Sequence, residues 1–162
     1  MIDYRPATES EWPAIIDLCV ETIRHINIRD YQQEQVREWI NRISNPGRMK
    51  NRLQDQSAWV AVDQGSLAGI ITWTSGGTID LLYVGKNHQR QGIGNRLISI
   101  AENKIFQQGV AEILVDVSIT AKPLFEQNGY RVITPQLVDL GSVQLSNFKM
   151  TKRTGIAKDL NQ

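Results

Sequence analysis

The chain has 162 residues, of which 41% are apolar and 22% charged, as in an ordinary globular domain. Its net charge of +1 gives no global field that would attract nucleic acid or an anionic membrane, and no apolar run is long enough to span a bilayer. The N-terminus lacks the apolar core of a signal peptide and Cys19 is the single cysteine, which excludes an internal disulfide, so we expect a cytoplasmic protein.

The first elements in chain order are a short strand and two helices. Residues 2–5 have a strand pattern, and Thr8-Glu-Ser-Glu11 has the form of a capping box, which predicts a helix that runs to about Arg24. A second helix is predicted over residues 31–43, and Asn45-Pro-Gly47 is expected to end it.

Three strands and a long helix follow. Residues 59–62 and 67–73 have the pattern of a hairpin, and a glycine turn leads into a third strand at residues 78–84. The next helix is predicted to begin after Gly92, carries apolar residues at helical spacing, and is closed by Gly109.

The last third of the chain completes the sheet. Its predicted elements are a buried strand, a short helix and two strands, at residues 113–117, 122–128, 130–140 and 143–151. This order predicts one mixed α/β domain over residues 1–153, followed by a polar C-terminal tail at 154–162.

The junction between the third strand and the long helix is the most informative part of the chain. A polar turn with Gly92 and Gly94 opens directly into the helix, where outward N–H groups and the helix dipole favour a phosphorylated ligand. A P-loop would need Lys-Ser/Thr where Asn95 and Arg96 stand. A dinucleotide-binding turn would need a small residue in place of Leu97, so neither motif is present.

The same turn resembles a known signature. Gln89-x-x-Gly92-x-Gly94 is similar to Arg/Gln-x-x-Gly-x-Gly/Ala, the acetyl-CoA signature of the GCN5-related N-acetyltransferase (GNAT) superfamily. The preceding Leu82-Tyr-Val84 resembles the fourth strand of that family, and Ala121–Tyr130 resembles its second motif, Ala-x-x-Phe-Tyr-Glu-x-x-Gly-Phe.

The resemblance covers about the whole domain and implies both fold and activity. The implied fold is an α/β (α+β) single domain, a mixed central sheet with splayed fourth and fifth strands flanked by helices. The implied activity is N-acetyl transfer from acetyl-CoA to a primary amine of a small molecule or protein, with CoA as product and a homodimer as a possible assembly. The segments His25–Trp39 and Asn147–Met150 further resemble the bacterial YafP-like subgroup.

The family also implies how the cofactor is held. Its pantetheine arm bonds along the fourth strand, here Leu82–Val84, and the turn wraps the pyrophosphate, where glycines let the phosphate approach the N–H groups. Lys86, Arg90 and Lys122 are candidates for charge-assisted contacts or are solvated surface residues. The implied cofactor contacts are Leu82, Tyr83, Val84, Gln89, Arg90, Gln91, Gly92, Ile93, Gly94, Asn95, Lys122 and Phe125.

Acetyl transfer needs a neutral amine and a polarised thioester carbonyl. A backbone N–H of the fourth strand, near Tyr83 or Val84, would stabilise the oxyanion. Asp80 is the candidate general base, because it lies on the same strand in phase with Leu82 and Val84. An equal alternative is that Asp80 has a structural role, in which neighbouring backbone groups supply the hydrogen bonds of its carboxylate.

The leaving thiolate lacks its usual partner. Phe125 stands where many family members place a tyrosine that protonates the thiolate. Tyr83 and Tyr130 are the substitute donors, and both also fit packing roles. A thiol with a pKa near ~8.5 is a tolerable leaving group, so Phe125 does not exclude activity.

The acceptor pocket of the family lies between the first two helices and the last two strands. His25, Tyr31 and Trp39 fall there as candidate substrate contacts, and each also fits a structural role. No acidic trough for polycationic acceptors is present, and nothing in the sequence identifies the acceptor.

Two other functions remain open. Phe125 leaves room for a non-catalytic CoA-binding module with a regulatory or partner-binding role. A nucleotide-binding protein is a third interpretation. The two histidines, His25 and His88, have no metal-ligand spacing, so no metal is expected.

Overall fold

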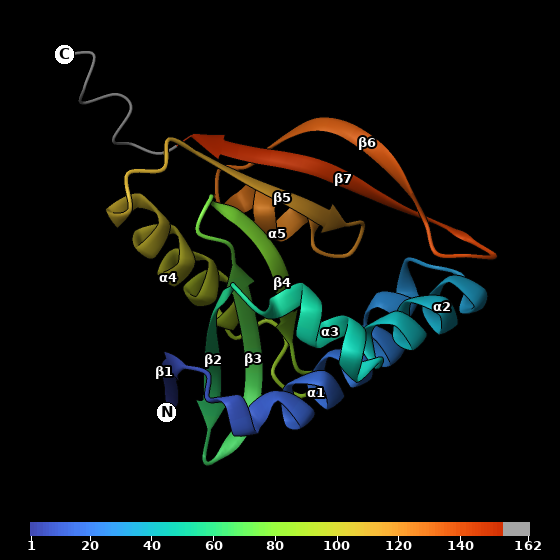
Figure 1. The fold of residues 1–162 in the computed structure, drawn as a ribbon, viewed down its shortest axis with the longest axis horizontal. Helices are drawn as coiled ribbons and strands as arrows, with labels where there is room; N and C mark the ends of the chain where they lie inside the picture. Colours follow the sequence, from blue (N-terminus) through green and yellow to red (C-terminus); the bar gives the residue numbers. More distant parts are fainter. Residues whose placement is uncertain (154–162) are drawn as a thin grey trace.

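A mixed sheet of seven strands organises the computed structural model, which describes residues 1–153 (Figure 1). Its spatial order is β1-β2-β3-β4-β5-β7-β6, and β4 and β5 are the one parallel pair in the described sheet. The predicted mixed α/β fold is confirmed, and the predicted tail lies outside the described residues. The elements are β1 (Ile2–Pro6), α1 (Trp12–His25), α2 (Gln33–Ile43), α3 (Pro46–Leu53), β2 (Ser57–Asp63), β3 (Ser66–Trp73), β4 (Thr78–Val84), α4 (Ile93–Gln107), β5 (Glu112–Ser118), α5 (Lys122–Gln127), β6 (Arg131–Asp139) and β7 (Gln144–Arg153), with 3-10 turns at Glu9–Glu11 and Asn27–Arg29.

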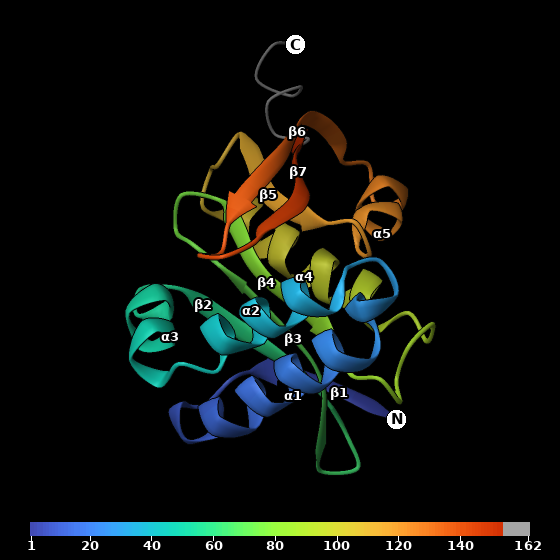
Figure 2. The ribbon, with the colours of Figure 1, turned by 90° about the vertical axis from the view of Figure 1, so that its right-hand side faces the viewer.

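Helices cover both faces of the sheet, and each face has its own hydrophobic core. Figure 2 shows α1, α2 and α3 together on one face. There Ile15 and Cys19 of α1 pack with Val36 of α2 and Met49 of α3 against the sheet residue Ile70. This core fixes the positions of α2 and α3 relative to the sheet.

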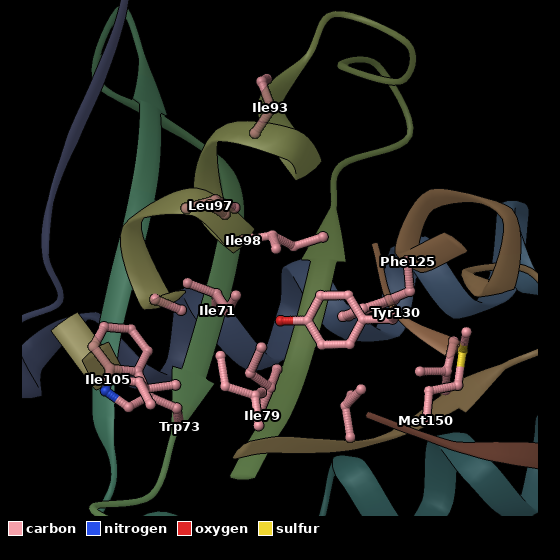
Figure 3. Close-up of a cluster of buried hydrophobic side chains, with 14 of the residues drawn as sticks. Ile71, Trp73, Ile79, Ile93, Leu97, Ile98, Ile105, Phe125, Tyr130 and Met150 are labelled. Atoms are coloured by element: carbon pink, nitrogen blue, oxygen red, sulfur yellow. The ribbon is translucent and has the colours of Figure 1, made fainter. Parts of the chain in front are cut away.

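The helix α4 covers the opposite face, as its apolar spacing predicts. Leu97, Ile98 and Ile105 are fully buried and pack against Ile71 and Trp73 of β3 (Figure 3). Burying a side chain of this size contributes about 1.5–3 kcal/mol, so the junction between β4 and α4 is held firmly. Within residues 1–153, no helix has the length and apolarity that a bilayer crossing requires.

The short helix α3 was not predicted. The second helix ends before Asn45-Pro-Gly47, as the sequence predicts, with Ile43 as the last residue of α2, yet Pro46 is also the first residue of α3. The side chain of Asn45 accepts the Arg48 N–H at 3.0 Å, and a proline at the first helical position costs no hydrogen bond. The same three residues therefore end α2 and begin α3, which becomes a wall of the site.

Candidate active site

A cleft opens where β4 and β5 part. The two strands pair only at Thr78↔Leu114 and Ile79↔Val115, and they diverge beyond those residues (Figure 1). A cavity of about 890 Å³ lies at this opening. The start of α4 and the helix α5 line one part of it, and the α1–α2 connection, α2 and α3 line the other. The predicted splaying of these two strands is confirmed.

The backbone of β4 presents unpaired groups to this cleft. The Gly85 N–H donates to Ala68 O on the β3 side at 2.8 Å. Because successive residues of a strand point their polar groups to opposite edges, those of Leu82 and Val84 face the open edge and those of Tyr83 face β3. The Val84 carbonyl already accepts the Gln89 side-chain amide at 2.7 Å, so the N–H groups of Leu82 and Val84 are the donors that face the cleft.

The turn before α4 has the geometry of an anion-binding nest. Arg90 and Gly92 both have positive φ, of 59° and 81°, and Gly92 caps the 15-residue α4 without a side-chain hydrogen bond. Alternating left- and right-handed residues at a helix start direct successive N–H groups to one point. The turn therefore fits a phosphate or pyrophosphate group, as its sequence predicts.

The two glycines of the turn serve different purposes. At Gly92 a Cβ would meet open space, so the constraint there is not steric contact. Glycine is required because the backbone is in the left-handed conformation, which other residues rarely adopt. A Cβ on Gly94 would lie 2.8 Å from Cδ2 of Leu124, so this glycine lets α5 approach α4. Sequence reasoning assigned both glycines to phosphate approach, and the structure shows that Gly94 also serves helix packing.

The side chains predicted to contact a cofactor fall into two groups. Lys122 lies outside the cleft lining, 3.6 Å from Glu126 and 5.1 Å above the Phe148 ring, and neither Gln91 nor Lys86 lines the cleft. The predicted contacts that do line the cleft are Leu82, Tyr83, Val84, Gln89, Arg90, Gly92, Ile93, Gly94, Asn95 and Phe125.

Asp80 faces a side of β4 that its spacing does not predict. A β-bulge lies between the Leu82 and Ile79 pairings with β3, so the alternation of side chains is interrupted. Leu82 and Val84 pack against the core beneath α4, whereas the Asp80 side chain contacts α3 on the opposite face. The expectation that Asp80 is in phase with Leu82 and Val84 is corrected.

The carboxylate of Asp80 is held by α3. Arg52 donates from Nη2 to Oδ1 at 2.6 Å and from Nε to Oδ2 at 2.9 Å, and Gln56 adds a bond to Oδ2 at 2.8 Å. Burial opposes ionisation of Arg52, but the hydrogen bond and charge of Asp80 raise the pKa of that guanidinium overall. A carboxylate can accept about four hydrogen bonds, and three are made here to Asp80.

The two candidate tyrosines lie in different places. Tyr83 lines the cleft, and burial raises the pKa of its hydroxyl well above the ordinary value. Tyr130 lies outside the cleft lining, in the core beneath α4 (Figure 3), where its hydroxyl donates to Glu102 at 2.9 Å. Burial, followed by the charge and hydrogen bond of Glu102, raises the pKa of Tyr130. Tyr83 is therefore the tyrosine that faces the open space.

Of the predicted acceptor contacts, only Trp39 lines the cleft. Tyr31 packs edge-on to Trp39 at 5.4 Å, and its hydroxyl joins β7 to the loop after β5 by donating to Ser146 O and accepting the Ile119 N–H. His25 does not line the cleft and lies 3.2 Å from Glu21 on the outer surface of α1. Tyr31 thus supports Trp39 from behind, and His25 is remote from both.

Sequence reasoning missed a group of arginines on the acceptor side of the cleft. They come from the α1–α2 connection, α2 and α3, and the two on α3 were overlooked because that helix was not predicted. Their positions are Arg29, Arg42, Arg48 and Arg52. The four-residue spacing of the last two was the available signal, since it places both on one helix face. Among residues 1–153, no group of three or more His, Cys, Asp or Glu side chains is placed to hold a metal.

Comparison with known proteins agrees with this geometry. The family model described as "Acetyltransferase (GNAT) domain" matches residues 27–154. The uncharacterized N-acetyltransferase YafP of Escherichia coli is 29% identical over 136 residues, which are 82% of this chain and 85% of that protein. A GCN5-related N-acetyltransferase structure from Rhodopseudomonas palustris superposes with a TM-score of 0.89 at 26% identity, covering 94% and 95% of the two chains. The PaiA N-acetyltransferase from Thermoplasma acidophilum, solved with coenzyme A, shares the fold with a TM-score of 0.75 at 21% identity over 95% and 99% of the chains.

Proposed function

The chain belongs to the GNAT acetyltransferase family, and on that premise we propose that it transfers the acetyl group of acetyl-CoA to an amine. The observation that carries the proposal is the continuity of two features. The unpaired edge of β4 runs directly into the anion-binding turn of α4. An extended arm that ends in a pyrophosphate matches this pair of features, and acetyl-CoA has that shape.

Acetyl-CoA would bind by backbone contacts. Its pantetheine amides would bond to the open edge of β4 at Leu82 and Val84, as an added strand would. The N–H groups between Gln89 and Asn95 would surround the pyrophosphate, with Arg90 as the nearby cleft-lining cation. The acetyl thioester would then lie at the strand opening, next to Tyr83.

The amine would attack the thioester carbonyl from the side of α2 and α3. The developing oxyanion would accept a bond from the N–H of Leu82 or Val84, whose position on a packed strand is fixed before the reaction begins. The acetyl group then passes to nitrogen, and the bond to sulfur breaks. Trp39 and Tyr83, with ring centroids 6.5 Å apart, would form the wall along which the acceptor enters.

Proton transfer involves Tyr83 and water. The hydroxyl of Tyr83 carries its proton near neutral pH, as any tyrosine does, and its place in the cleft lining makes that proton available to the departing thiolate. Burial raises the pKa of this hydroxyl and so makes it a weaker acid than a solvated tyrosine. The ammonium proton would leave through water in the cleft, since Asp80 is engaged by Arg52 and Gln56. In this proposal Asp80 orients Arg52 and does not act as the base.

One observation favours a second candidate, a CoA-binding module without catalysis. Phe125, 2% exposed, lines the cleft where a tyrosine acid is usual in the family. Thiol release from acetyl-CoA across amine classes separates the two proposals. Release that depends on an added amine supports the transferase, and tight acetyl-CoA binding without release from any amine supports the module. Stabilisation by NAD or ATP equal to that by CoA would contradict both.

A further inference from the structure

The acceptor side of the cleft is lined by arginines from three segments. Arg29 lies in the α1–α2 connection, Arg42 on α2, and Arg48 and Arg52 on α3. We infer that the acceptor is a small amine that also carries an oxyanion, a carboxylate or a phosphonate, which these arginines bind. This inference rests on the proposed acetyl transfer and specifies its acceptor.

Arg42 is the first residue that supports an anionic ligand. Its side chain is half-buried, lines the cleft one helical turn from Trp39, and has no ion-pair or hydrogen-bond partner within residues 1–153. Partial burial of a guanidinium without an acceptor costs free energy. A carboxylate or phosphonate in the cleft would supply that acceptor with two parallel bonds, the geometry that arginine favours.

Arg48 and Arg52 add a second, independent observation. They are four residues apart on α3 and both line the cleft, so their like charges repel across one helix turn. Arg52 uses Nε and Nη2 for Asp80, which leaves Nη1 directed away from that carboxylate. Asp80 thus fixes the plane of Arg52, and a bound anion would offset the repulsion between the two arginines.

Acidic side chains also line the cleft and limit where an anion fits. Asp80 is compensated by Arg52, and Asp116 on β5 accepts a bond from Gln136 at 3.0 Å. Asp30 adjoins Arg29 at the mouth formed by the α1–α2 connection. Among the cleft-lining arginines of α2 and α3, Arg42 and Arg48 have no ion-pair partner within residues 1–153, so the anion would bind at the surface that these two form.

This arrangement orients the acceptor. The anionic end would bind between α2 and α3, and the amine would extend along Trp39 and Tyr83 toward Leu82 and Val84. The cavity of about 890 Å³ must also hold the acyl arm, so the space that remains suits a small molecule. A polycationic amine would meet the arginines and be repelled.

The test compares amines in matched pairs that differ only in the anion. Thiol release is measured for α-amino acids against their amides, for 2-aminoethylphosphonate against its diethyl ester, and for spermidine, with rates corrected for the fraction of free amine. We expect an acidic member to exceed its neutral partner in kcat/KM by about tenfold or more. The pair that shows the difference tells whether the acceptor carries a carboxylate or a phosphonate.

Two variants locate the effect. Arg42→Gln is expected to bring the acid-to-neutral ratio close to one while acetyl-CoA affinity is kept. Arg37→Gln is the matched control, because it makes the same charge change on an exposed position of α2 that does not line the cleft. A wild-type preference for neutral amines or spermidine would overturn the inference and leave the proposed acetyl transfer intact.

A binding measurement tests the anion site even if none of the amines is acetylated. N-acetyl amino acids and their amides are added to the CoA-loaded protein, whose pyrophosphate turn is already filled, and melting temperatures are recorded. A larger stabilisation by the acid, lost in Arg42→Gln and kept in Arg37→Gln, supports the anion site. Equal stabilisation by acid and amide overturns it, whereas failure to bind CoA at all contradicts the proposed function instead.

Discussion

Arg52 of α3 binds both carboxylate oxygens of Asp80 on β4, at 2.6 and 2.9 Å, across the acceptor side of the cleft. This ion pair joins a helix that sequence reasoning missed to the strand that carries the cofactor edge. It also gives Asp80 a structural task, which is to hold a cation in a fixed plane beside the reacting groups. Whether Asp80 can act as a base therefore depends on its ion pair with Arg52 as well as on its position on β4.

Asp80→Asn is expected to impair acceptor binding more than the chemical step. Because the amide cannot hold Arg52 in place, KM for the amine should rise by about tenfold with a small change in kcat. Arg52→Gln should have the same effect, and the double variant should be no worse than either single one. Steady-state kinetics of the three variants provide the measurement. A large loss of kcat in Asp80→Asn alone, with a changed pH profile, would instead identify Asp80 as the general base.

Tyr83→Phe is expected to lower kcat without changing acetyl-CoA affinity. General acids contribute about 10²- to 10⁴-fold, and a thiol is a good leaving group, so the loss should lie near the lower end of that range. The deficit should shrink as pH rises above ~8.5, where the thiolate no longer needs a proton. A pH series of kcat for both proteins checks this. A deficit that is constant with pH would indicate that Tyr83 acts by packing.

Tyr130→Phe is expected to affect stability and not turnover. The substitution removes the hydroxyl that donates to Glu102, which keeps its contact with Lys152 at 2.9 Å. A hydrogen bond to a charged group contributes about 1.5–3 kcal/mol, so the free energy of unfolding in urea should fall by that order. Loss of kcat in a variant that remains folded would restore Tyr130 as a catalytic candidate.

The two glycines of the turn should respond differently to alanine. In Gly94→Ala the new Cβ would press on the tip of Leu124, so Leu124→Ala in the same chain should restore CoA affinity. In Gly92→Ala the left-handed backbone is strained by roughly 1–2 kcal/mol whatever Leu124 does, and no rescue is expected. Calorimetric titration with CoA measures all four variants. Equal rescue of both alanine variants would refute this division of roles.

The start of α1 should carry a measurable pH dependence of stability. Hydrogen bonds from Arg5 and then Thr8 lower the pKa of Glu11 to about 2. A carboxyl with a lowered pKa in the folded state stabilises the protein at pH values above its unfolded pKa of ~4.3, and this stabilisation is lost as pH falls toward 2. The difference in unfolding free energy between the wild type and Glu11→Gln should therefore shrink between about pH 5 and pH 2. A difference that does not change over this interval would contradict the assignment.

The cofactor side of the site was predictable because its parts are close in sequence. The strand, the turn and the start of the helix lie within residues 78–97, and strand alternation and helix capping are local properties. The order of helices and strands was predictable for the same reason, except at Asn45-Pro-Gly47, which ends α2 and also begins α3. A proline after an asparagine can end one helix and begin the next, and the buried residues of α3, Met49 and Leu53, are too few to reveal a helix by periodicity.

The acceptor side could not be predicted, because it is assembled from distant elements. The direction of Asp80 depends on a β-bulge, which strand periodicity cannot show. Its partner Arg52 lies 28 residues earlier on the missed helix. Trp39, placed with the apolar face of α2, also lines the cleft because the sheet opens beside it. Each of these facts is a relation between elements and has no local sequence signal.

The most direct test of acetyl transfer is product detection with a deuterated acetyl group. The protein is incubated with acetyl-CoA carrying the labelled acetyl group and with the matched amine panel, and mass spectrometry follows the label. We predict that the label appears on the amine nitrogen, one N-acetyl group for each thiol released, and that Tyr83→Phe slows both products equally. Saturating, specific binding of acetyl-CoA with all of the label remaining on the thioester would contradict this prediction and would identify a CoA-binding module.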